Sequence, residues 1–163
     1  KKAYEIEFIF EKQNVSTEII YVYSLKKDQY LNLTTISNHK VTNTRCDVKI
    51  KGVLDNNSVS TYVGKIIIEQ NAQQTKSYLH DDVLVMGENT KNTSQPILSI
   101  EANDVSATHG ATTGRINKDQ VYYLQSRGLT KKEAERIITE GFFEKILSQI
   151  KDEQVREKVL STL

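Results

Sequence analysis

The sequence predicts a mainly β fold that ends in a small helical domain. Up to about Asn103, apolar residues alternate with polar ones, which is the period of a half-buried strand. Beyond that point, apolar residues recur at helical spacing. The strand-like runs read YEIEFIF, EIIYVYSL, QYLNLTTI, CDVKIKGVL, STYVGKIIIE, DDVLVMG and PILSIEA. We therefore expect a β domain over residues 1–105 and a helical domain over residues 106–163.

Clusters of turn-forming residues separate the strand-like runs. Examples are Lys27-Asp28, Asn38-His39, 55–57, Gln70-Asn71 and 87–89. A sandwich, a barrel and a β-solenoid all fit this pattern, and no short repeat decides between them. Frequent Asn, Ser and Thr at the turns favour a solenoid, whose coils stack polar corners in ladders.

Capping motifs mark the start of two helices after the β region. Asn117 with Gln120 resembles a capping box, in which Asn replaces Ser or Thr. Thr130 with Glu133 is a stricter capping box and predicts the start of the second helix. Gly128 lies between them, where the first helix needs a residue in the left-handed conformation.

Apolar residues continue at helical spacing to the end of the chain. Those of the second helix are Ala134, Ile137, Ile138, Phe142, Phe143, Ile146, Leu147 and Ile150. A third short helix is predicted near Glu153–Thr162 from the positions of Val155, Val159 and Leu160. The helical domain should therefore contain three helices.

Composition limits the class of protein and its surroundings. A net charge of +1 provides no large electrostatic surface for nucleic acid or a membrane. The single cysteine, Cys46, excludes an internal disulfide and suits a reducing compartment such as the cytoplasm. No apolar run approaches the roughly 20 residues of a membrane helix. The opening KKAYEIEF is already in strand rhythm, so we expect a piece of a longer protein whose β domain is truncated on its N-terminal side.

The segment THGATTGRINKDQVYYLQSRGLTKKEAERIITEGFF resembles the C-terminal signature of the SufB/SufD family of iron–sulfur cluster assembly scaffolds. The matching residues are His109, Gly110, Ala111, Thr112, Gly114, Asp119, Gln120, Tyr123, Leu124, Ser126, Arg127, Gly128, Glu133, Ala134 and Phe142. Upstream, KGVLDNNSVSTYVGKIIIEQNAQQT resembles another segment of this family. The motifs H-G-A-T and S-R-G, in place of H-E-A-T and Q-R-G, favour the SufD side of the family.

The resemblance implies a right-handed parallel β-helix followed by a helical domain. It also implies a non-enzymatic scaffold that pairs with a SufB-type paralogue and binds a SufC-type ATPase through its C-terminal helices. We expect no cofactor to be bound stably by the isolated chain, and a transient iron–sulfur cluster in the assembled complex. A homodimer is expected when the chain is alone, with neither nucleic acid nor a membrane as partner. The location would be cytoplasmic, or a plastid-type organelle in a eukaryote.

Two histidines are candidates for contact with a cluster. The resemblance places His109 at the interface between the SufB and SufD subunits, where the family's histidine is implicated in cluster assembly. His80 is the lesser candidate, because the SufB paralogue carries a cysteine near this place and imidazole can replace thiolate toward iron. On residue type alone, His80 fits better as a solvated turn residue beside Asp81 and Asp82. Cys46 is expected in the core, and His39 in a turn without functional signal.

The helical domain supplies candidates for partner binding. These are Tyr123, Arg127, Gly128, Phe142 and Phe143, because aromatic residues and arginine are enriched at interface hot spots. Arg127 equally fits a role at the C-terminus of the first helix.

Two other classes of function stay open from the residues alone. A β-helix carbohydrate-active enzyme needs paired carboxylates on one face, and Asp47, Asp55, Asp81 and Asp82 are available. However, these residues fall mostly at predicted turns, and the chain has no tryptophan for stacking on sugars. A purely structural solenoid module would explain the strands but not the signature in the tail.

Overall fold

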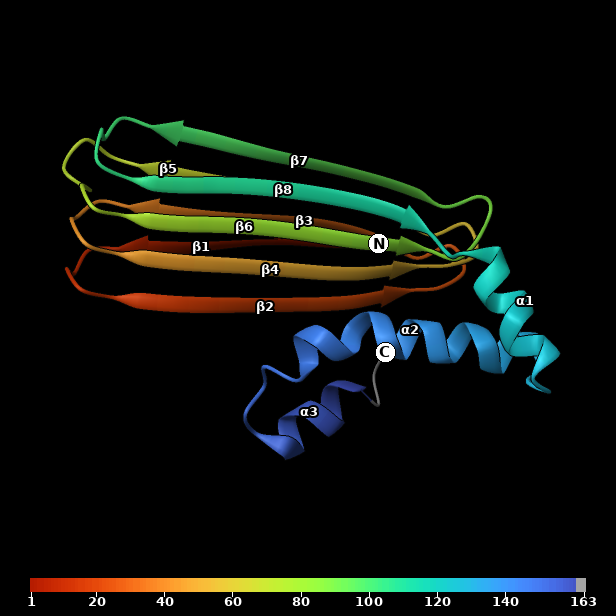
Figure 1. Ribbon diagram of the computed structural model, residues 1–163. Helices are drawn as coiled ribbons and strands as arrows, with labels where there is room; N and C mark the ends of the chain where they lie inside the picture. Colours follow the sequence, from red (N-terminus) through yellow and green to blue (C-terminus); the bar gives the residue numbers. More distant parts are fainter. Residues whose placement is uncertain (161–163) are drawn as a thin grey trace.

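Two parallel β-sheets, stacked face to face, form the body of the protein. The computed structural model describes residues 1–160 of the chain. The strands are β1 (Lys2–Phe10), β2 (Ser16–Leu25), β3 (Tyr30–His39), β4 (Arg45–Leu54), β5 (Val59–Ile68), β6 (Lys76–Val85), β7 (Lys91–Ile100) and β8 (Ser106–Arg115). Sheet A has the order β1-β3-β5-β7, and sheet B has the order β2-β4-β6-β8. The chain alternates between the sheets and winds into a parallel β-solenoid, as predicted, with the strands of the two sheets running in opposite directions (Figure 1).

Each coil takes about 30 residues and stacks in register on the coil before it. Tyr30 of β3 pairs with Val59 of β5, and Arg45 of β4 pairs with Lys76 of β6. Every second residue of a strand points between the sheets, so that buried and partly buried residues alternate along β3 and β5. The register repeats but the residue types do not, which explains why the sequence shows no short repeat.

Polar ladders form at the corners of the coils. Asn14, Asn43 and Gln74 occupy equivalent corners with positive φ angles of 62°, 57° and 59°. The amide nitrogen of Asn14 donates to the carbonyl oxygen of Asn43 at 3.0 Å, and that of Asn43 to Gln73 at 2.9 Å. The Asn43 side-chain amide also donates to Asn14 Oδ1. Asn visits the left-handed region more readily than most residues, so polar corners are compatible with stacking, as predicted.

Three helices follow the solenoid. They are α1 (Lys118–Ser126), α2 (Lys131–Leu147) and α3 (Glu153–Leu160). Both predicted N-caps are confirmed: Asn117 accepts from the first turn of α1, and Thr130 forms a reciprocal capping box with Glu133. Gly128 follows α1 with a φ of +97°, also as predicted. Over residues 1–160, no helix is long and apolar enough to cross a membrane.

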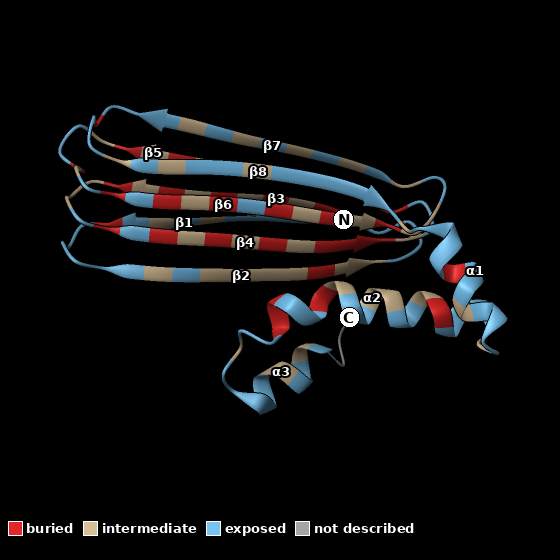
Figure 2. Ribbon diagram, viewed as in Figure 1, coloured by how far each residue is buried: buried red, intermediate tan, exposed pale blue. Residues whose placement is uncertain are grey.

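The helix α2 packs against the outer face of sheet B. Phe143, Ile146 and Leu147 of α2 form a second hydrophobic cluster with Val53 of β4. Partly buried side chains around this cluster are Ile20, Val22, Leu84, Met86, Phe142, Ile150 and Val159. Figure 2 shows the buried positions of α2 and the alternating burial along β4 and β6. The tail is therefore packed on the solenoid through its apolar face.

The structure moves the start of the helical part. Residues 106–115, which we assigned to the helical domain, form β8 and pair with β6 in sheet B. The first helix begins only at Lys118. The small residues of β8 give no apolar alternation, so the sequence did not reveal this strand. The predicted third helix is present to Leu160, and its last predicted residues, Ser161 and Thr162, lie outside the described residues.

Candidate functional site

His109 lies on β8, at the edge of sheet B in the described chain. Its pairing neighbour is Leu79 of β6, and no described strand pairs with the other side of β8. The His109 side chain is exposed, and β8 is exposed along most of its length (Figure 2). The chain at His109 also borders a hollow of about 440 Å³, with Arg45, Tyr78 and His80. A second molecule that approached this edge would meet the imidazole directly.

His80 lies in the middle of β6 and points away from the core. Its side chain is 59% exposed, and its Nε2 lies 3.3 Å from Asp82 Oδ1. A Cβ atom on Gly110 of β8 would lie 3.0 Å from His80 Nδ1, so the glycine leaves space for this ring. Our interpretation of His80 as a turn residue was therefore wrong. The structure places it on the outer face of β6, next to β8, whereas His109 is in register with the inward-facing Leu79.

The described residues around this hollow do not form a complete metal-binding site. Within residues 1–160, no three His, Cys, Asp or Glu side chains are grouped so that they could hold a metal ion. His109, in register with inward-facing Leu79, and His80, on the outer face of β6, are thus two separate imidazoles on opposite faces of sheet B.

We predicted His39 in a turn, but the structure places it in the core. It ends β3 fully buried, stacked on Phe10 with ring centroids 4.4 Å apart. Its Nδ1 is 2.8 Å from Thr44 Oγ1 and its Nε2 is 3.1 Å from Ser77 Oγ. Burial lowers the pKa of His39 to about 4. The imidazole is therefore neutral at physiological pH and its polar atoms are satisfied inside the core.

Cys46 is buried in the core, as expected. Its Sγ lies 3.3 Å from Ser37 Oγ. Burial raises the pKa of the Cys46 thiol, which keeps it protonated. A protonated, enclosed thiol packs as a small hydrophobic group and does not act as a nucleophile.

Asp81 is an ionisable core residue that sequence reasoning missed. It lies on the inward face of β6, fully buried, and neither carboxyl oxygen has a hydrogen-bond partner among the described residues. Burial raises the pKa of Asp81 to about 6, and the nearby Ser94 hydroxyl opposes this rise without reaching normal hydrogen-bond geometry. Strand parity is the signal that could have found it, because Leu79 and Val83 share its face.

The acidic residues do not form the paired carboxylates of a glycoside hydrolase. Asp81 points into the core, whereas Asp82 lies on the outer face of the same strand. Asp47 is bound by Arg45 at 2.7 Å near the start of β4, and Asp55 follows the far end of that strand. These positions do not support the carbohydrate-active alternative.

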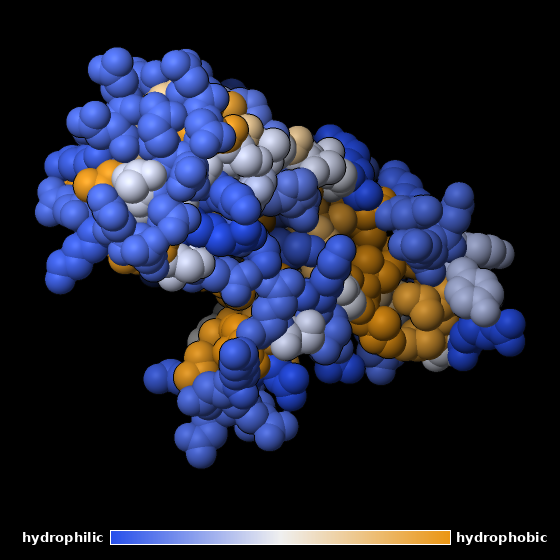
Figure 3. Space-filling view, turned by 60° about the vertical axis from the view of Figure 1, so that its left-hand side comes forward, coloured by the Kyte–Doolittle hydropathy of each residue, from blue (hydrophilic) through white to orange (hydrophobic). Residues whose placement is uncertain are grey.

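The helical part exposes aromatic side chains around α1. Tyr122 is 74% exposed and Tyr123 is 56% exposed. The Arg127 guanidinium lies over the Tyr123 ring, 5.2 Å from its centroid. Tyr123 also borders a largely apolar hollow with Leu124 and Ile138. A space-filling view shows a mostly hydrophilic surface on which hydrophobic side chains gather in patches (Figure 3).

The two phenylalanines of α2 differ from our expectation for partner contact. Phe143 is only 1% exposed and belongs to the cluster under α2, so its side chain is not accessible to a partner. Phe142 is partly buried, with the Lys51 ammonium 4.3 Å from its ring centroid. Gly128 provides the turn after α1 and no side chain for contact. Tyr123 and Arg127 remain the accessible candidates.

The fold and its exposed edge define a class of protein: a parallel β-solenoid with a packed helical tail. Comparison with protein families then identifies which solenoid family this is. Residues 2–142 match the SufBD core domain of SUF system FeS cluster assembly. The chain belongs to this family of iron–sulfur cluster assembly subunits.

Individual relatives agree with this assignment. The chain is 30% identical over 154 residues to an iron–sulfur cluster assembly SufBD family protein of Mycobacterium leprae, covering 90% of this chain and 39% of that protein. It is 34% identical over 112 residues to SufD of Bacillus subtilis, covering 69% of this chain and 26% of that protein. It is 31% identical over 113 residues to SufD of Escherichia coli, covering 69% of this chain and 27% of that protein. The chain thus spans well under half of these relatives.

Proposed function

We propose that the chain is part of a SufD-like, non-enzymatic scaffold subunit for iron–sulfur cluster assembly. In this proposal it pairs with a SufB-type paralogue along β8 and binds a SufC-type ATPase through α1 and α2. The observation that carries the proposal is His109 on an exposed edge strand in a chain of the SufBD family. An unpaired strand edge offers backbone groups to a second chain, and His109 would then lie within the interface.

The proposed role of His109 is to contact the cluster that is being assembled. The cluster is cargo, held transiently in the complex, and the isolated chain binds none stably. A neutral imidazole nitrogen is a suitable ligand for iron. Further ligands would come from the partner, and His80, on the neighbouring strand, is the secondary candidate within this chain.

The test of this role compares His109→Ala with Thr108→Ala in the complex with the SufB-type and SufC-type partners. Both residues are exposed on β8, so each change should alter the free energy of unfolding by at most about 0.5 kcal/mol. Iron and sulfide analysis after reconstitution should show a several-fold loss of cluster for His109→Ala only. Normal loading of His109→Ala would contradict the role.

The proposed ATPase contact is tested with Tyr123→Ala and a matched control, Tyr4→Ala. Both tyrosines are exposed, but Tyr4 lies on β1, outside the helical tail. Loss of an aromatic hot spot costs more than about 1 kcal/mol, so affinity for the SufC-type ATPase should fall at least fivefold for Tyr123→Ala. Calorimetry on the parent and both variants gives the comparison. Equal affinities in all three proteins would show that Tyr123 is not part of the contact with the ATPase.

A further inference from the structure

A second hollow on the outer face of sheet B gathers lysine side chains from two elements. It measures about 310 Å³ and lies between α2 and strands β4 and β6. Lys49 and Lys51 line it from β4, Lys145 from α2, and His80 and Asp82 from β6. We call it the lysine hollow. None of its lysines is used in the proposed contacts of His109 with the cluster or of Tyr123 with the ATPase.

Lys51 is the most enclosed of the three lysines. Its side chain is 14% exposed, and its Nζ donates to the carbonyl oxygen of Phe142 at 2.9 Å. The carboxylate of Asp82 is 4.0 Å from this ammonium, too far for a close ion pair. Burial lowers the pKa of Lys51, and the charge of Lys145 lowers it further, against the opposite effect of Asp82. The fold thus holds two ammonium groups near each other with incomplete compensation.

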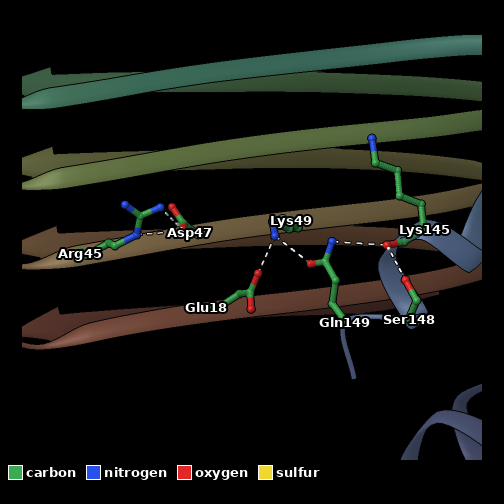
Figure 4. A network of polar contacts seen from close by, with 7 residues as sticks. All are labelled: Glu18, Arg45, Asp47, Lys49, Lys145, Ser148 and Gln149. Carbon is green, nitrogen blue, oxygen red and sulfur yellow. Dashed lines mark hydrogen bonds and ion pairs between the residues drawn. The ribbon is translucent and has the colours of Figure 1, made fainter. Parts of the chain in front are cut away.

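Lys145 has no counter-charge among the described residues. Its side chain extends from α2 over sheet B, and its ammonium makes no hydrogen bond or ion pair within residues 1–160 (Figure 4). The other cations shown there are paired, Arg45 with Asp47 and Lys49 with Glu18. The backbone of Lys145 is held in place because the side chains of Ser148 and Gln149 donate hydrogen bonds to its carbonyl oxygen. Gln149 in turn accepts from Lys49 at 2.8 Å.

The charges around the lysine hollow do not balance. Three ammonium groups, Lys49, Lys51 and Lys145, face two carboxylates, Glu18 and Asp82. A bound anion would accept hydrogen bonds from Lys145, which has no acceptor in the described chain, and would reduce the repulsion between Lys51 and Lys145. His80 Nδ1 faces Gly110, whereas its Nε2 faces Asp82, so His80 lines the hollow without directing a ring nitrogen at the anion.

We propose that the lysine hollow binds one oxyanionic group, a phosphate or a carboxylate, held chiefly by Lys51 and Lys145. The group can come from a free ion or from an acidic side chain of a bound peptide, because both present the same oxygen atoms to the ammonium groups. The proposal does not rest on the assignment to cluster assembly, and its test requires no other subunit.

The experiment measures the thermal midpoint Tm of the chain with increasing inorganic phosphate, at pH 7.5 and constant ionic strength set with chloride. Ligands that bind only the folded state raise Tm with concentration. The variant is Lys145→Gln, and the matched control is Lys91→Gln, an exposed lysine on β7 of sheet A. We expect the same upward shift for the parent and Lys91→Gln, and a loss of most of this shift for Lys145→Gln. A fluorescent tetraglutamate peptide, measured by anisotropy with the same proteins, tests the carboxylate source.

The outcomes separate clearly. A phosphate effect that depends on Lys145 supports a site for a free ion, and peptide binding alone that depends on Lys145 supports an acidic segment as the source. If phosphate raises Tm equally in all three proteins, the effect reflects general exclusion of the salt from the protein surface. If peptide binding also does not depend on Lys145, this result overturns the proposal. Absence of both effects also overturns it. Lys51→Met serves as a second variant and should weaken the binding that Lys145→Gln weakens.

Discussion

Asp81 places a carboxyl group between the two sheets without a hydrogen-bond partner in the described chain. Its pKa of about 6 lies above the ordinary value of 3.8, so the folded state favours the protonated form. Stability should therefore fall as pH rises from about 3.8 to about 6, and stay at the lower level above that range. The native fold tolerates this cost because the surrounding core is large and apolar.

Replacing Asp81 with Asn should stabilise the protein at pH 7.5 and change little at pH 4. The shift of about two pKa units corresponds to roughly 1 to 3 kcal/mol at pH 7.5, since each unit is worth about 1.4 kcal/mol. Urea unfolding at both pH values measures this difference. Asp82→Asn, on the outer face, is the matched control and should have a small effect at either pH. A destabilised Asp81→Asn protein at pH 7.5 would show that the carboxylate has a stabilising partner.

His39 has the opposite dependence on pH. Its pKa of about 4 lies below the ordinary value of 6.5, so the folded state disfavours the charged form. The stability is complete above pH 6.5 and falls as the pH decreases toward 4. In His39→Gln, this loss between pH 6.5 and 4 should disappear, although the protein should be weaker at pH 7 by about 1 to 2 kcal/mol because the stacking on Phe10 is lost. Denaturant midpoints between pH 4 and 6.5 provide the measurement. If the midpoint of His39→Gln depends on pH as strongly as that of the parent, His39 is not the cause of the loss.

The composition around His39 and Asp81 did not reveal that these two residues are buried. Asn38-His39 and Asp81-Asp82 have the composition of turns, and only the strand parity with Leu79 and Val83 could have indicated that Asp81 faces the core. What makes His39 acceptable in the core is Ser77 of the next coil, 38 positions away in the chain. His109 was found only through the family signature, because its strand has no apolar pattern. Its exposure became visible only when β8 proved to be the edge of sheet B.

At the level of the elements, helix ends were the most predictable feature. Thr130, Glu133 and Gly128 act through contacts within a few residues, so that a short window of sequence contains the whole cause. The strand β8 is the opposite case, because its pairing with β6 fixes its conformation and its small residues do not. The alternation of β3 and β5 was clear because one face of each strand meets the core.

Two glycines in different elements should respond differently to alanine. A Cβ on Gly52 of β4 would overlap the Tyr23 ring in the core, so Gly52→Ala should reduce the free energy of unfolding by about 1 to 3 kcal/mol. Gly141 lies within α2 with nothing within 4 Å of the added carbon, so Gly141→Ala should increase it by about 0.5 to 1 kcal/mol. Chemical denaturation of both variants is the test. A stabilising Gly52→Ala would mean that Tyr23 moves aside without cost.

The whole molecule has an open strand edge at each end of the solenoid in the described chain. We expect the isolated chain to form a homodimer through β8, where small exposed residues allow a second strand to approach. Light scattering over a concentration series should show a dimer for the parent, and Thr108→Lys with Thr112→Lys should abolish it. Ile9→Lys on β1 is the control for the other end. A parent that stays monomeric would contradict the prediction, and a dimer sensitive only to Ile9→Lys would place the interface at β1.

The constant coil length of about 30 residues has a consequence for how the chain folds. Each strand pair closes a loop of nearly the same length, so the entropic cost of adding a coil does not grow with the number of coils already formed. Stability then approximates a sum over coils and their nearest neighbours. Folding can begin on any adjacent pair of coils and propagate toward both ends, and the terminal coils, with one neighbour each, should be the first to exchange their amide hydrogens.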